Sequence, residues 1–286
     1  MAETLIIAAL CGVIVGILSG LLGIGGGVIV IPLMRLGFGV PGLVATGTSL
    51  FVILPTSISG VIGRLRSKSL NVKIGLCVGL GGVIFSPIGS WASEQAGGMA
   101  AMIAAAVVIA YTGANMIRKA LKLEKPVAAG NPGESGATSK NTREATIAAE
   151  KNMFTDSMNF KIDGKSLAKM LAVGAIAGFL SGFIGVGGGF LIVPMLMWMF
   201  GFSFKDASGL SLMALCVLCI PGVITHGLFG NIDYLRGLML IIGSIPGSFL
   251  GTALLKHVHE KSLRIAFGIL LFGVGIMLGV NEFVLA

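Results

Sequence analysis

Two short glycine runs are the residues of this chain best suited to hold a ligand. They read GIGGG at residues 23–27 and GVGGG at residues 185–189, and each interrupts an apolar segment. A glycine run lets the backbone turn and leaves its amide N–H groups uncovered by side chains. Helices that start after the runs, near Val28 and Phe190, would point their N-termini at the break, and helix N-termini attract anions. The predicted ligand glycines are Gly25, Gly26, Gly27, Gly187, Gly188 and Gly189.

Close packing of helices through small residues is the alternative explanation for these glycines. A dinucleotide site is a poor one, because no strand–helix–strand unit and no acidic ribose ligand accompany the runs. The doubling of the runs and the proline that follows each of them, Pro32 and Pro194, favour the anion site. The sequence therefore predicts a small anion held by backbone donors.

Hydroxyl side chains in the segment after each run are further candidates. They can donate to the oxygens of an anion and stay neutral in lipid, or they can bond back to a helical carbonyl. The candidates are Thr46, Thr48, Ser49, Ser208 and Ser211. Ser19 and Ser181 precede the runs and could cap or line the site. His226 could bind an anion when protonated, relay a proton, or lie at the membrane interface.

Cysteine spacing offers a competing chemistry. Cys216 and Cys219 have the C-x-x-C spacing of redox and metal sites, but no histidine or further cysteine lies beside them. All four cysteines lie in apolar segments, which is typical of packing residues. We therefore predict no catalytic residue, no metal site and no cofactor, with a membrane redox enzyme as the alternative.

The elements that carry these residues are membrane-spanning helices. Of 286 residues, 55% are hydrophobic and only 11% are charged, whereas soluble domains carry about a quarter charged residues. Apolar runs recur at about the 18 residues needed to cross a bilayer, and they do not alternate as barrel strands do. The runs are residues 5–22, 40–63, 74–92, 99–117, 170–184, 207–228, 238–255 and 265–280. The chain is thus predicted to be an all-α polytopic membrane protein.

The chain contains an internal repeat. SGLLGIGGGVIVIP at residues 19–32 returns as SGFIGVGGGFLIVP at residues 181–194, an offset of 181 − 19 = 162. At the same offset TGTSL, from Thr46, meets SGLSL, from Ser208. With one residue less, GGVIFSPIGS from Gly81 meets IGSIPGSFLG from Ile242. Each half is predicted to hold a glycine-broken re-entrant or discontinuous helix followed by three ordinary transmembrane helices.

Domain boundaries follow from the repeat. We predict a first membrane repeat at residues 1–118 and a second at residues 167–286. Residues 119–166 are rich in polar and charged side chains that cannot build a core, so they read as a soluble linker. The N-terminal segment lacks the basic start of a signal peptide, so we keep it as mature structure.

Basic residues predict how the halves face. Net charge is +8, but the charges gather at segment ends, which indicates membrane orientation and not nucleic-acid binding. One cluster follows the second segment of the first half, and another follows the third segment of the second half. The two clusters are Arg64, Arg66, Lys68 and Lys73, and Lys256, Lys261 and Arg264. Both face the cytoplasm with the linker if each glycine-broken unit enters and returns on one side, which makes the halves inverted repeats.

The doubled GxGGG…P segment, the TGTSL/SGLSL pair and the GNID turn at residues 230–233 resemble the sulfite exporter TauE/SafE family of membrane transporters. The resemblance covers nearly the whole chain except the linker. It implies export of small sulfur-containing anions, such as sulfite, sulfoacetate or related organosulfonates, across a bacterial inner membrane.

The functional prediction is a secondary transporter that exports a small anion, sulfite or a small organosulfonate or carboxylate, by alternating access. A channel for small anions or neutral solutes is the alternative. The expected partners are the anion, the lipid bilayer and, as a candidate coupling ion, the proton; uniport driven by membrane potential stays open. Monomer and homodimer are both open.

Overall fold

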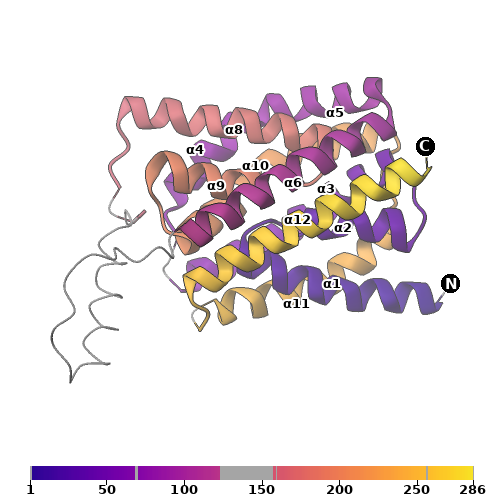
Figure 1. Cartoon of the computed structure of the whole chain (residues 1–286), viewed down its shortest axis with the longest axis horizontal. Coiled ribbons are helices and arrows are strands. Elements are labelled where there is room, and N and C mark those ends of the chain that lie inside the picture. Colours follow the sequence, from indigo (N-terminus) through magenta and orange to yellow (C-terminus); the bar gives the residue numbers. More distant parts are fainter. Residues whose placement is uncertain (1, 68–69, 123–156, 159, 256, 286) are drawn as a thin grey trace.

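The computed structural model describes residues 2–67, 70–122, 157–158, 160–255 and 257–285. These residues form long helices that lie side by side in one layered bundle (Figure 1). The first half contains α1 (Ala2–Leu22), α2 (Gly27–Pro32), the π-helical η1 (Leu33–Gly37), α3 (Gly42–Arg66), α4 (Val72–Val83), α5 (Phe85–Ala96) and α6 (Gly98–Lys122). The second half contains α8 (Gly164–Ile184), α9 (Gly189–Phe200), α10 (Phe204–Leu228), α11 (Tyr234–Leu254) and α12 (Glu260–Leu285).

Six of these helices are long and apolar enough to cross a membrane, namely α3, α6, α8, α10, α11 and α12. A seventh span forms if α4 and α5, which meet at an angle of 41°, are counted together. The prediction of an ordinary span over residues 74–92 is therefore wrong in its geometry. Pro87 explains the bend, because its ring lacks an N–H and clashes with the carbonyl four residues earlier, that of Val83.

Glycines let α1 and α11 approach closely. Gly12, Gly16 and Gly20 lie one helical turn apart on α1, and their Cα atoms face the α11 backbone at Leu240, Ser244 and Ser248. Both helices advance in the same direction along this contact, so they are parallel. Small residues at such spacing allow backbones to touch and pack tightly in membranes.

The same contact occurs between α8 and the bent pair α4–α5. Gly174, Gly178 and Gly182 face the backbone at Val78, Gly82 and Ser86. These contacts correspond one by one to those between α1 and α11. Each α8 glycine lies 162 residues after an α1 glycine, and its partner on α4 or α5 lies 162 residues before the α11 partner of that glycine. The one-residue shift expected between residues 81–90 and 242–251 is wrong at these contacts.

Gly16→Ala should destabilise the protein, because the new Cβ would clash with the carbonyl oxygen of Ser244. Overpacking of this kind costs about 1–3 kcal/mol. Gly273→Ala in α12 is the matched control, since nothing lies within 4 Å of its Cβ position and alanine favours helix by about 0.5–1 kcal/mol. Thermal unfolding in detergent measures both; equal midpoints for the two variants would contradict close packing at Gly16.

The centre of the bundle is a crossing of α3 and α10. Leu212 fills the space beside Gly60, and Leu50 fills the space beside Gly222, so the two helices run in opposite directions. The outer pair α6 and α12 is also antiparallel, because Gly113 faces Gly268 whereas Ala110 faces Gly275. Helices of the two halves are thus interleaved, and both halves contribute to each of the two hydrophobic clusters of the core.

The bundle has two distinct ends. The start of α1 and the end of α12 lie at one end, and the end of α6 and the start of α8 lie at the other, which we call the linker end (Figure 1). Phe160, just before α8, packs on Phe200, the last residue of α9, and on Phe202, just beyond it, with ring centroids 5.7 and 5.2 Å apart. The α8–α9 pair therefore starts and finishes at the linker end.

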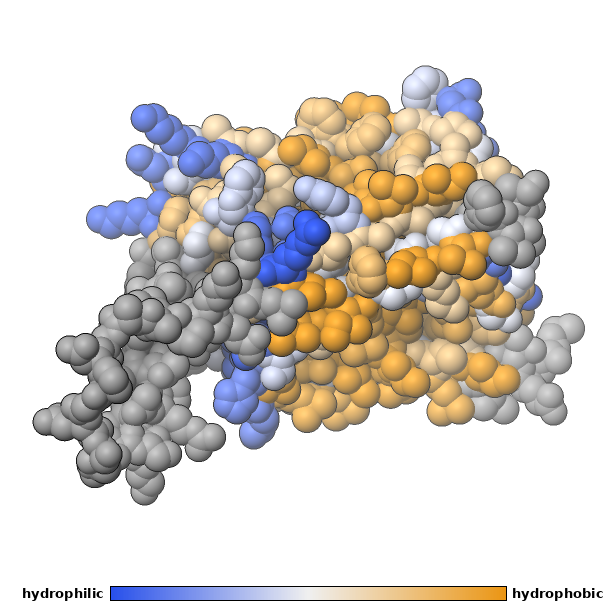
Figure 2. Space-filling model, in the orientation of Figure 1, coloured by the Kyte–Doolittle hydropathy of each residue, from blue (hydrophilic) through white to orange (hydrophobic). Residues whose placement is uncertain are grey.

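The surface is hydrophobic along the flank of the bundle and hydrophilic at the linker end (Figure 2). Near the predicted linker boundaries, α6 continues through Lys122 and α8 begins at Gly164. A helix continues there because residues 119–122 keep good helix formers. Of the predicted linker, residues 123–156 and 159 lie outside the described residues, as do Lys68 and Lys256.

Candidate functional site

Both glycine runs break their helices as predicted. In the first break Gly23, Gly25 and Gly26 have φ values of 75°, 76° and 88°, a left-handed conformation that suits glycine. The second break repeats this with Gly185 and Gly187 at 78° and 85°. The following helices begin at Gly27 and Gly189, so the prediction of starts near Val28 and Phe190 is confirmed within one residue.

The two breaks touch each other at the centre of the protein. A Cβ on Gly189 would lie 3.0 Å from the carbonyl oxygens of both Gly23 and Ile24. Gly25 and Gly187 both abut Ile53 of α3 and Leu215 of α10. These two residues lie near the middle of their helices, so the breaks lie at the mid-depth of the bundle.

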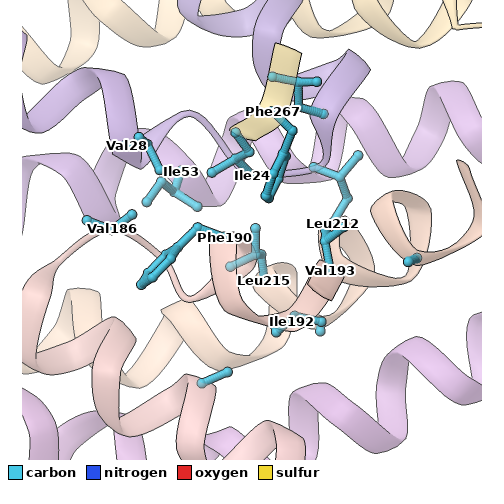
Figure 3. Packing of buried hydrophobic residues seen from close by; sticks show 14 of the residues in the cluster. Ile24, Val28, Ile53, Val186, Phe190, Ile192, Val193, Leu212, Leu215 and Phe267 are labelled. Carbon is cyan, nitrogen blue, oxygen red and sulfur yellow. The ribbon is translucent and has the colours of Figure 1, made fainter. Parts of the chain in front are cut away.

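Apolar side chains fill the space around the breaks. Ile24 and Val28 from the first break, and Val186 and Phe190 from the second, converge with Ile53 (Figure 3), and all are at most 1% exposed. The six predicted ligand glycines are gathered here, and each lies against a neighbouring chain segment. In this conformation the glycines therefore allow close packing at the breaks, and their binding of an anion stays a prediction.

Three predicted hydroxyls hold the backbone of the breaks. Ser211 donates to the carbonyl of Gly23 at 2.8 Å and lies 3.5 Å from that of Gly189. Ser49 donates to the carbonyl of Gly27 at 3.5 Å, and Thr46 to that of Ile184 at 3.4 Å. Backbone that leaves a helix at membrane depth needs such partners, and these side chains supply them from α3 and α10.

Ser208 connects the first break to a buried arginine. Its backbone packs on Gly23, and its hydroxyl accepts a hydrogen bond of 2.5 Å from Nη2 of Arg64. Nη1 of Arg64 donates to the carbonyl of Lys205 at 2.7 Å. The Arg64 side chain is only 1% exposed, and the Asp206 carboxylate acts on it electrostatically.

The prediction that Arg64 belongs to a solvent-facing basic loop is wrong. Arg64 lies in the last turn of α3, inside the bundle, because Gly209 on α10 leaves room for the guanidinium beside it. The sequence did contain an indication that Arg64 lies inside the protein. Arg64 and His226 are 162 residues apart, so an ionisable side chain stands at the same position of both halves.

Two predicted residues lie away from the breaks. Thr48 accepts a hydrogen bond of 2.9 Å from the backbone N–H of Asp233, at the start of α11. His226 lies with Nε2 3.2 Å from the carbonyl oxygen of Gly182 and is fully buried. The His226 side chain therefore does not lie on the surface of the bundle, although it belongs to the last turn of α10. The structure does not bring either side chain to the crossing of the breaks.

Buried hydroxyls also lie near the breaks. Among the described residues, the hydroxyls of Ser19, one helical turn before the first break, and of Ser57 on α3 have no hydrogen-bond partner, and the same holds for those of Ser86, Ser93 and Ser157 elsewhere. Ser181, one helical turn before the second break, lies beside the thiol of Cys219. The Ser57 hydroxyl lies beside Gly25, 3.2 Å from its Cβ position. Unpaired buried polar groups are rare in native proteins. The sequence did not indicate Ser57, because it lies outside the repeated TGTSL/SGLSL motif.

Comparison with known proteins gives a consistent result. The family model described as "Sulfite exporter TauE/SafE" matches residues 8–278. The "Probable membrane transporter protein YunE" of Bacillus subtilis is 26% identical over 280 residues, which cover 96% of each chain. The "Probable membrane transporter protein MJ0441" of Methanocaldococcus jannaschii is 28% identical over 281 residues, 93% of this chain and 92% of the relative. No solved structure matches the chain significantly.

Proposed function

The chain belongs to the sulfite exporter TauE/SafE family of multi-pass membrane transporters, and from this premise we propose that it is a secondary transporter that exports a small anion. The proposed substrates are sulfite and small organosulfonates or carboxylates. The proposed site is formed by the two breaks, Arg64 and the hydroxyls around them.

The proposal of an anionic substrate rests on Arg64. A cation inside a membrane protein is expensive and marks a substrate or ion pathway. Arginine also binds carboxylate, sulfite and sulfonate oxygens through paired N–H groups. Here the guanidinium lies one side chain, Ser208, away from the first break. A nearby carboxylate, Asp206, offsets part of its charge, so a bound anion would compete with Asp206 for the guanidinium.

One face of α3 links the breaks to the linker end. Ser49, Ser57 and Arg64 are separated by 8 and 7 positions, which at 3.6 residues per turn keeps them on one side of the helix. The proposed route for an anion runs along this face, from Arg64 toward the unpaired hydroxyl of Ser57 at the breaks. An exporter needs such a route on its cytoplasmic side.

Alternating access is supported by the reciprocal packing of the halves. Ser208 packs on Gly23, and Thr46 packs on Gly185, with each pair exchanged at the 162-residue spacing. The related helices α3 and α10 are antiparallel, as inverted repeats require. Motion of one half against the other would then open the breaks to either side in turn.

Charge placement supports a cytoplasmic linker in a bacterial inner membrane. The described basic residues at the linker end include Arg66, Lys73, Lys119, Lys165, Lys169, Lys205, Lys261 and Arg264. At the other end Arg236 pairs with Asp233, and Asn231 with Glu94. Lysine and arginine accumulate on the cytoplasmic side of membrane proteins.

Reconstitution in proteoliposomes tests the proposal. We expect saturable uptake of labelled sulfite or sulfoacetate that is accelerated by the same anion on the opposite side. A parallel thermal-shift screen with sulfite, sulfoacetate, taurine and acetate should show stabilisation by the transported anions, because ligands stabilise the state that binds them. Flux that rises linearly with concentration and unitary currents would identify a channel and refute the proposed mechanism.

We propose His226 as the carrier of a coupling proton, because it is fully buried and its Nδ1 has no hydrogen-bond partner among the described residues. If His226 carries the proton, an inward-directed proton gradient drives anion flux. His226→Gln should then remove the effect of the gradient but retain exchange of anion for anion. Flux that is unchanged by an imposed gradient in the wild-type protein would exclude proton coupling.

A further inference from the structure

A groove on the flank of the bundle lies outside the proposed anion site. It has a volume of about 830 Å³ and lies between α6 and α9, with Arg264 of α12 at one end. Its lining includes Val108, Tyr111, Met116, Leu191 and Pro194. The lining is mainly apolar, and Tyr111 is 72% exposed, so the groove opens sideways from the bundle.

The groove runs along the direction in which a lipid chain lies. Its lining on α6 extends from Val108 to Ala120, which corresponds to about 18 Å at a rise of ~1.5 Å per residue. The Ala120 end lies at the linker end, and Val108 lies about halfway along α6 (Figure 1). Because α6 is a candidate membrane span, the groove extends from the membrane interface into the hydrocarbon.

The interfacial end of the groove carries positive charge and an aromatic ring. Nζ of Lys119 lies 5.6 Å from the ring centroid of Trp198, and the Trp198 side chain is 75% exposed. Arg264 is the second cation, and its Nη2 lies 2.6 Å from a carboxylate oxygen of Glu260. No carboxylate is found among the described residues that line the groove itself, so Lys119 supplies most of the positive charge there.

We propose that this groove binds an anionic phospholipid, with the phosphate at Lys119 and Arg264 and one acyl chain against α6 and α9. Basic pockets between transmembrane helices on one face of a membrane bind acidic head groups. Tryptophan favours the head-group level, which matches the position of Trp198. A free phosphate ion would leave the apolar 18 Å of the groove empty, so a lipid fits both parts of the surface.

A lipid in this groove would contact a helix of the transport machinery. Leu191 and Pro194 belong to α9, which begins at the second glycine break. Occupancy of the groove therefore supports α9 from its lipid side. The proposal does not depend on which substrate the breaks hold, and lipid binding is measured without substrate.

The test uses the full-length protein, delipidated in detergent and titrated with phosphatidylglycerol or phosphatidylcholine. Native mass spectrometry and thermal shift report binding. We expect preferential binding of phosphatidylglycerol, weakened about fivefold by Lys119→Ala, the effect of one basic residue near an anionic surface. Asn115→Trp, at an exposed position in the groove, should block the acyl chain, whereas Lys165→Ala, an exposed cation at the same end but outside the groove, should have no effect.

Several outcomes would overturn the proposal. Equal binding of the two lipids would remove the role of charge, and an equal loss in Lys119→Ala and Lys165→Ala would show nonspecific attraction. Full competition by inorganic phosphate would identify an ion site without an acyl chain. Binding that appears only after removal of residues 123–156 would show that the chain's own linker occupies the groove.

Discussion

Arg64→Gln should reduce anion transport about tenfold to a hundredfold, whereas Arg66→Gln should leave it nearly unchanged. Arg64 is buried and bonded to Ser208 and Lys205, so glutamine removes the buried positive charge on the proposed route. Loss of a hydrogen bond to a charged group costs about 1.5–3 kcal/mol, and each 1.4 kcal/mol is tenfold. Arg66 is two positions further along the same helix, exposed, and stacked on Phe249.

The folded state must be checked in the same experiment, because Arg64→Gln also leaves partners inside the protein. Arg64→Lys retains the charge but loses the paired N–H geometry, so we expect it to fold and to raise KM more than it lowers the maximal rate. Ser208→Ala should also raise KM more than it lowers the maximal rate, but by a smaller factor than Arg64→Lys. Folded Arg64→Gln protein that transports and is stabilised by sulfite like wild type would refute the role of Arg64.

Gly23→Ala and Gly185→Ala should each lower the unfolding midpoint by roughly 10 °C or prevent folding. A Cβ on Gly23 would lie 2.5 Å from Cα of Ser208, and one on Gly185 would lie 2.6 Å from Cα of Thr46. Both glycines have positive φ, which costs a residue with a Cβ about 1–2 kcal/mol. Overpacking against backbone adds about 1–3 kcal/mol, and each kcal/mol shifts the midpoint by about 2–4 °C.

Gly39→Ala separates these two effects. Gly39 has a φ of 64° and nothing within 4 Å of its Cβ position, so the variant carries the backbone strain without the clash. Fluorescence-detected size exclusion and thermal unfolding measure all three proteins. If Gly39→Ala is as unstable as the other two, contact between the breaks and the opposite half does not hold the fold together.

The parts of the fold that depend on local sequence were predictable. The breaks at Gly23 and Gly185 follow from glycine density alone, and the apolar runs follow from hydropathy. The bend at Ile84 was also readable, because Pro87 stands inside an apolar run. The ends of α6 and α8 were not readable to the residue, because charged residues such as Lys119 are good helix formers and end a span without ending its helix.

Predicting the surroundings of single side chains requires knowledge of what the other half places beside them. Arg64 is buried because of Gly209, which is 145 positions away. Thr48 points to Asp233, and His226 to Gly182, although both were predicted to line the site. The repeat shows which positions of the two halves are equivalent, but it does not predict which residue of one half contacts which residue of the other.

The parallel contact between α1 and α11 has a consequence for how the protein is made. Gly12 and Leu240 are 228 positions apart, so at synthesis rates of ~5–20 residues per second α1 leaves the ribosome roughly 10–45 s before its partner. Its glycine face must be kept from other helices during this time, by lipid or by the insertion machinery. The first half is therefore not an independent folding unit, and a nascent chain halted before α11 should be a substrate for membrane quality control.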